Sequence, residues 1–162
     1  MSQIIRYYPV HIPLGLAIII LQSTLLAKTG HQNILIVLIL HLGGTAHFLS
    51  GGILTLFFGL IQDTLSGSPA GLSSLFYLFI FFAGSLLRRG LAAGHPFFQM
   101  GLVFLSGGFL YLFLSWVIGS AFPSVMDFLS VLFTALISPF LFNLFNLLES
   151  LYSNYSHPKS ID

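Results

Sequence analysis

Apolar residues form six long runs along this chain, separated by short polar stretches. The runs cover about residues 9–27, 33–43, 51–65, 70–87, 97–118 and 125–150. Several approach the roughly 20 apolar residues that a helix needs to cross the hydrocarbon core of a membrane. The pattern therefore predicts an all-α polytopic membrane protein, a bundle of six transmembrane helices joined by short loops. Residues 1–152 would form one integral membrane domain, and residues 153–162 a polar C-terminal tail.

The connection between the second and third runs contains four glycines in the ten residues from Gly43 to Gly52. Each glycine weakens a helix by about 1 kcal/mol relative to alanine. The spacing leaves almost no loop between two full-length helices. We therefore expect two short or tilted helices joined by a glycine-rich hairpin near the membrane surface, of the kind that lines cavities in membrane proteins.

Composition supports a lipid environment for most of the chain. Of the 162 residues, 56% are hydrophobic and only 6% are charged, with a mean hydropathy of +0.98. An ordinary soluble domain carries about 25% charged residues because its surface faces water. These values exclude a soluble enzyme and a nucleic-acid-binding protein, and the absence of cysteine excludes disulfides and thiolate metal sites.

The few basic residues predict the orientation. Six crossings place both termini on one side of the membrane. That side would hold Arg6, Arg88, Arg89 and Lys159, whereas the other side would hold only Lys28. Short cytoplasmic loops carry an excess of Lys and Arg, so we expect both termini to be cytoplasmic.

Asp63 is the only charged residue between Lys28 and Arg88. A carboxylate at the bilayer centre costs about 2.5–3.5 kcal/mol on insertion scales, and intramembrane acids usually have a partner or a function. Two interpretations stay open: an interfacial or helix-capping residue, and an inward-facing residue that holds a partner. Gly59 lies one turn earlier on the same helix face, where a missing side chain lets another backbone come close.

The six histidines do not form a recognisable metal motif. His41 and His47 are six residues apart, not the four that place two ligands on one helix face. His11 is expected near a membrane edge. We therefore predict interfacial histidines, no metal and no cofactor. Catalysis is not expected either, because the sequence offers no activated nucleophile beside a base.

Four features together carry a resemblance to a known family. They are Gly59-Leu-Ile-Gln-Asp63, the turn Ser66-Gly67-Ser-Pro69-Ala-Gly71, the pair Arg88-Arg89 after the next helix, and Thr134-Ala-Leu-Ile-Ser-Pro139 in the last helix. With these features the chain resembles the rod shape-determining protein MreD family. The resemblance extends over essentially the whole chain, but only residues 59–71 are specific.

The resemblance implies a non-enzymatic scaffold of the cell-elongation machinery in the bacterial cytoplasmic membrane. Its partner would be MreC, a bitopic protein with one transmembrane helix and a periplasmic coiled coil. Together they would help to link the MreB cytoskeleton to the glycosyltransferase and transpeptidase of peptidoglycan synthesis. Asp63 and the turn would fix the outer rim of the binding site, while Arg88 and Arg89 would anchor the cytoplasmic side near anionic lipid.

We expect a groove of small residues to accept the partner helix by close packing. Its members would be Gly51, Gly52, Gly59, Gly101, Gly107 and Gly108.

The alternative function is the substrate-binding membrane subunit of an energy-coupling-factor type vitamin importer, whose fold the MreD family is said to resemble. Such a subunit needs a polar pocket for a hydrophilic ligand. It also carries an Ala-x-x-x-Ala patch in its first helix, whereas here Ala17 is followed at that spacing by Leu21. A holin-like pore is a third option.

Overall fold

The computed structural model describes residues 2–24, 34–66, 69–87, 95–118 and 124–156, which form six α-helices and no strand. The helices are α1 (Ser2–Thr24), α2 (Ile34–Thr45), α3 (Phe48–Ser66), α4 (Leu72–Leu86), α6 (Pro96–Ile118) and α7 (Val125–Ser156). The prediction of an all-helical chain is therefore confirmed. Most helix ends lie within a few residues of the predicted ones, except that α1 begins earlier and α7 extends further into the polar tail.

Helix α2 occupies the centre of the bundle and contacts each of the other five helices. Every residue from Leu35 to Gly44 is buried. A helix that is apolar on all sides is typically buried, with other helices or lipid around it. The uninterrupted run of Ile, Leu and Val at 34–40 therefore explains why this short helix forms the core.

The connection between α2 and α3 is shorter than predicted. Only Ala46 and His47 separate the two helices, so the four glycines lie inside helices and not in a hairpin loop. Close packing explains why helix persists there: a Cβ on Gly43 would lie 2.8 Å from the carbonyl oxygen of Phe81, and one on Gly51 would lie 2.6 Å from the Phe81 ring. The glycines let α2 and α3 approach α4.

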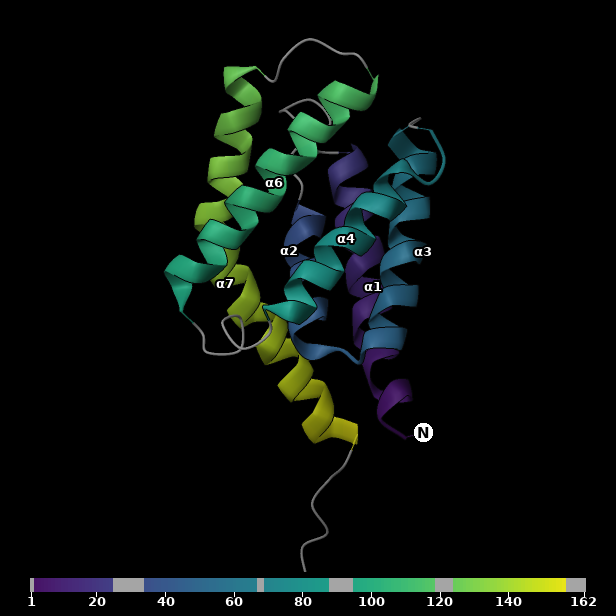
Figure 1. The fold of residues 1–162 in the computed structure, drawn as a ribbon. Coiled ribbons are helices and arrows are strands. Elements are labelled where there is room, and N and C mark those ends of the chain that lie inside the picture. The colour runs from purple at the N-terminus through teal and green to yellow at the C-terminus, as the bar shows by residue number, and fades with distance from the viewer. Residues whose placement is uncertain (1, 25–33, 67–68, 88–94, 119–123, 157–162) are drawn as a thin grey trace, which may run out of the picture.

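Successive helices alternate in direction along the bundle (Figure 1). Helix α4 packs against α2 and α3, and α6 pairs with α7. The start of α1 and the end of α7 lie at the same end of the bundle, and the α3–α4 turn lies at the opposite end (Figure 1).

Helix α7 begins with a reciprocal cap. The Asp127 carboxylate accepts a hydrogen bond from the backbone N–H of Ser124 at 2.8 Å, and the Ser124 hydroxyl lies 3.3 Å from the backbone nitrogen of Asp127. This arrangement satisfies N–H groups that have no partner within the helix. Pro139 lies inside the helix, where it removes one backbone hydrogen bond, and α7 is visibly bent (Figure 1).

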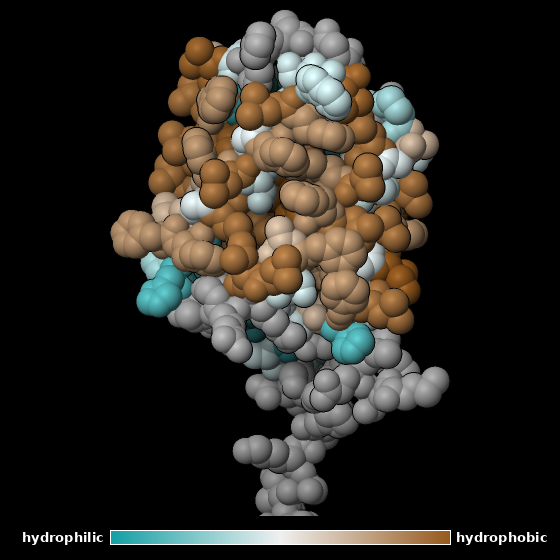
Figure 2. Space-filling view, in the orientation of Figure 1, coloured by the Kyte–Doolittle hydropathy of each residue, from teal (hydrophilic) through white to brown (hydrophobic). Residues whose placement is uncertain are grey.

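Three helices are long and apolar enough to cross a membrane. They are Phe48–Ser66, Pro96–Val117 and Val125–Tyr152. The remaining apolar helical segments, His11–Thr24, Ile34–Thr45 and Leu72–Leu86, are shorter than 18 residues. Apolar side chains cover the middle of the face in Figure 2, and hydrophilic residues lie towards its two ends.

Candidate functional site

Asp63 forms a capped corner between α3 and α4. Its side chain is only 1% exposed, near the C-terminal end of α3. One carboxylate oxygen accepts a hydrogen bond from the backbone N–H of Gly71 at 2.8 Å, and the other accepts one from Ser73 at 2.9 Å. The first N–H groups of a helix lack intrahelical partners and carry partial positive charge. Asp63 therefore caps α4, as the helix-capping interpretation predicted, and its carboxylate is engaged within the chain.

Gly59 allows this corner to close. A Cβ at position 59 would lie 2.3 Å from the Cα of Ser74, so any larger residue would collide with the backbone of α4. The Ser74 hydroxyl also donates a hydrogen bond to the carbonyl of Leu56 at 3.3 Å. The Gly-x-x-x-Asp spacing thus places the close contact and the cap on the same face of α3, one turn apart.

The turn itself uses Pro69 and Gly71. Gly71 has φ of +95°, a conformation that glycine adopts at little cost. Pro69 is exposed and its carbonyl accepts a hydrogen bond from Leu72 at 3.2 Å. Gly67, Arg88 and Arg89 lie outside the described residues.

Thr134 and Pro139 do not join this corner. Thr134 is buried in α7 and donates its hydroxyl hydrogen to the carbonyl of Ser130, one turn earlier in the same helix, at 2.9 Å. Pro139 lies where α7 loses a backbone hydrogen bond. The Thr-x-x-x-x-Pro segment therefore affects the geometry of α7 and takes no part in the α3–α4 corner.

The predicted groove of small residues is not a continuous surface. Gly51 and Gly59 pack against α4, and a Cβ on Gly107 would lie 2.9 Å from Val131 of α7. These glycines mediate packing within the chain, whereas Gly101 and Gly108 have no atoms within 4 Å of such a Cβ. For Gly51, Gly59 and Gly107 the prediction was wrong, because spacing does not distinguish internal contacts from contacts with a partner.

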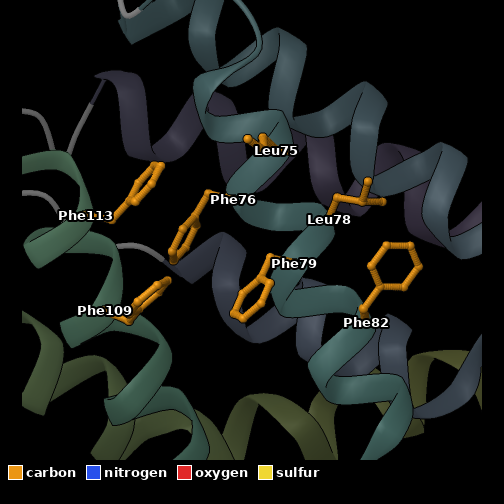
Figure 3. A pocket seen from close by; sticks show the side chains of 7 residues that line it. All are labelled: Leu75, Phe76, Leu78, Phe79, Phe82, Phe109 and Phe113. Carbon is orange, nitrogen blue, oxygen red and sulfur yellow. The ribbon is translucent and has the colours of Figure 1, made fainter. Parts of the chain in front are cut away.

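An apolar groove lies instead between α4 and α6. It has a volume of about 370 Å³, and all seven side chains that line it are apolar (Figure 3): Leu75, Phe76, Leu78, Phe79, Phe82, Phe109 and Phe113. Phe76 of α4 stacks on Phe109 and Phe113 of α6, with ring centroids 6.0 and 6.2 Å apart. This groove can bind hydrocarbon or an apolar helix face, and it offers nothing to a hydrophilic ligand.

A second polar site lies among α1, α2 and α7. His11 and His41 are 1% and 2% exposed, and the Nε2 atoms of both approach Oε1 of Glu149, at 3.1 and 3.6 Å. The two imidazole rings stack with centroids 6.0 Å apart. His11 was predicted near a membrane edge and the histidines as interfacial. Both histidines are buried between helices, and their depth in a membrane stays a prediction. Among the described residues, His11, His41 and Glu149 are a group that could hold a metal.

Sequence reasoning missed this cluster because its members are far apart along the chain. Only the fold brings residues 11, 41 and 149 together, so no spacing of neighbouring residues in the sequence predicts the cluster. One signal was present: His41 interrupts an otherwise apolar run that must be buried. A polar residue buried in that position needs a partner, and the acidic residue of the last helix lies beside it, with Oε1 of Glu149 3.6 Å from Nε2 of His41.

The fold and these sites define an all-helical bundle with three helices able to cross a membrane, which is consistent with a membrane protein. Comparison with protein-family models, curated proteins and solved structures found no match for this chain.

Proposed function

We propose that this chain is a non-enzymatic integral membrane scaffold of the rod shape machinery, similar to MreD, that binds the transmembrane helix of a bitopic partner such as MreC. It would reside in the bacterial cytoplasmic membrane with six crossings and cytoplasmic termini. Through this partner, and with MreB and the elongation glycosyltransferase and transpeptidase, it would couple the cytoskeleton to peptidoglycan synthesis.

Two structural features support this topology. Successive helices alternate in direction, and the start of α1 lies at the same end of the bundle as the end of α7 (Figure 1). Three helices meet the length for a span, and the three shorter ones belong to the same bundle. Short spans are accommodated in membranes by local thinning and by flanking residues.

The observation that carries the proposal is the apolar groove between α4 and α6. Leu75 and Phe79 project from α4 and are more than half exposed, and the groove is open along a surface that would face lipid. Helices associate in membranes through van der Waals packing of complementary shapes. An apolar partner helix would gain many such contacts with the phenylalanine-lined walls, and ordered protein side chains fill a fixed groove better than mobile lipid chains.

Residues 59–71, the specific part of the resemblance, lie outside the groove but position α4, which forms one of its walls. Asp63 and Gly71 fix the first turn of α4, and α4 supplies five of the seven lining residues. The α3–α4 corner therefore sets the position of the groove wall formed by α4, as expected of residues at the outer edge of the binding site. Arg88 and Arg89 would follow α4 on the cytoplasmic side, next to anionic lipid and the filament.

The vitamin-importer alternative gains no support from this groove. A hydrophilic vitamin needs convergent polar groups, and the seven lining residues supply none from their side chains. Vitamin binding and pore formation are outcomes that the following experiment can reveal.

Cysteine crosslinking tests the proposal directly, because the chain has no cysteine of its own. The variants Leu75→Cys and Phe79→Cys, in the groove, are co-expressed with a partner that carries single cysteines along its transmembrane helix. Leu60→Cys, exposed on α3, is the matched control outside the groove. We expect crosslinks to MreC from positions 75 and 79, repeating every three to four residues along its helix, and none from position 60.

Equal crosslinking from all three positions would contradict the groove assignment. If MreC is absent from mild-detergent preparations, while a vitamin co-purifies or vesicles containing the protein leak, the scaffold proposal fails.

A further inference from the structure

A cluster of three ionisable side chains lies at the end of the bundle away from the α3–α4 corner. His11 comes from α1, His41 from the central helix α2 and Glu149 from the last turns of α7. Their ligand atoms all lie within 4.8 Å of one another. The corner and the groove use none of these residues, so the cluster requires its own explanation.

Two polar atoms of this cluster, one in His41 and one in Glu149, lack a hydrogen bond. Nε2 of His41 and Oε1 of Glu149 have no hydrogen-bond partner in the described part of the chain, although the two atoms are 3.6 Å apart. Buried polar atoms are nearly always hydrogen-bonded, and an exception requires a reason such as a missing ion. Three metal-ligating atoms within 4.8 Å of one another, two of them without a hydrogen bond, could share a bound cation.

The two separations that involve Glu149 also fit a metal ion. Zinc bound tetrahedrally at 2.0–2.1 Å holds its ligand atoms roughly 3.3 Å apart. The distances from Glu149 Oε1 to the two imidazole nitrogens are 3.1 and 3.6 Å. Two imidazoles and one carboxylate form a ligand set for Zn²⁺ that leaves one position open. Glu149 is 24% exposed, so an ion can reach the site from this side.

The surroundings hold the histidines in place. The His41 ring contacts the rings of Phe142 and Phe145, with centroids 5.8 and 5.4 Å away. These two residues and Glu149 repeat at spacings of three and four along α7, so they share one face of that helix. A buried apolar shell restricts solvent access and strengthens ligand binding.

We propose that His11, His41 and Glu149 form a divalent transition-metal site, best suited to Zn²⁺, that fastens α7 to α1 and α2. The ion would neutralise the Glu149 carboxylate and bind Nε2 of His41, which has no hydrogen bond in the described residues. The ion would join three helices that are far apart in the sequence, and its fourth position would be taken by water. The inference does not depend on the proposed scaffold function.

The test measures zinc in protein purified with a histidine-free tag. We expect about one bound Zn²⁺ per chain after dialysis against zinc chloride and removal of excess metal. The Glu149→Gln variant, which keeps the shape of the side chain, should bind Zn²⁺ at least tenfold more weakly. The His47→Gln variant is the matched control, because His47 is exposed at the α2–α3 connection, and it should bind like the wild type.

Two further measurements keep the result decisive if a variant is unstable. Added ZnCl2 should raise the melting temperature of the wild type and of His47→Gln, and a chelator should reverse this rise. Co²⁺ bound to the wild type should show the d–d absorption of a site with nitrogen and oxygen ligands. Absence of metal from the wild type, or equal zinc binding by Glu149→Gln, overturns the proposal and leaves the cluster as a contact between two histidines and a glutamate.

Discussion

At the residue scale, the close contact at Gly59 explains why a glycine precedes Asp63 by one turn. We predict that Gly59→Ala lowers the free energy of unfolding by about 1–3 kcal/mol, the usual cost of overpacking, because the new Cβ would meet the Ser74 backbone. Thermal unfolding in detergent measures this. Gly108→Ala is the control, since a Cβ there meets nothing within 4 Å, and it should be neutral or stabilising by up to about 1 kcal/mol. Equal effects would contradict the packing argument.

Asp63 differs from Asp127 in burial although both cap a helix. We predict that Asp63→Asn lowers the free energy of unfolding by about 1–3 kcal/mol, because an amide has only one acceptor oxygen for two partly buried N–H groups. Asp127→Asn, at the partly exposed start of α7, should cost about 0.5–1 kcal/mol since water can replace the lost acceptor. Urea or thermal unfolding of both variants compares them. A larger loss for the Asp127 variant would show that the α3–α4 corner is not the more important cap.

At the element scale, the surrounded position of α2 makes it the least tolerant helix. We predict that Leu38→Ala lowers the free energy of unfolding by about 2–4 kcal/mol through the cavity that it leaves. Leu136→Ala, on the exposed face of α7, should cost less than about 1 kcal/mol. Equilibrium unfolding in mixed micelles can rank the two. A similar cost for both would mean that α2 is not the packing core.

The six helices were predictable from the sequence because long apolar runs and turn residues are local signals. The glycines near the α2–α3 connection were predicted to form a hairpin, because glycine has a low helix propensity. Close packing of Gly43 and Gly51 against α4 stabilises the helices by more than this local cost. Asp63 was identified from charge scarcity alone. The contact of His11 and His41 with Glu149 was not predictable, because it depends on which helix faces meet.

At the scale of the whole molecule, the bundle has two distinct ends and a continuous apolar middle. The capped α3–α4 turn lies at one end, and the start of α1 lies at the other (Figure 1). The groove between α4 and α6 is lined on α4 by residues between 75 and 82, which lie between these ends. Under the proposed function, a partner helix would lie against this part of α4, and the orientation of the bundle would decide which end of the partner is nearer the turn.

Side-specific labelling of single cysteines tests that orientation. We predict that Pro69→Cys reacts with a membrane-impermeant maleimide in intact spheroplasts, because the α3–α4 turn would face the periplasm. His47→Cys, which is exposed at the opposite end of α3, should react only after the membrane is permeabilised. Since α3 is long enough to span, the two positions should never be labelled from the same side. Labelling of both positions in intact spheroplasts would show that α3 does not cross the membrane. The reverse pattern would place the termini in the periplasm. The basic residues would then face outward, against the excess of Lys and Arg that cytoplasmic loops carry.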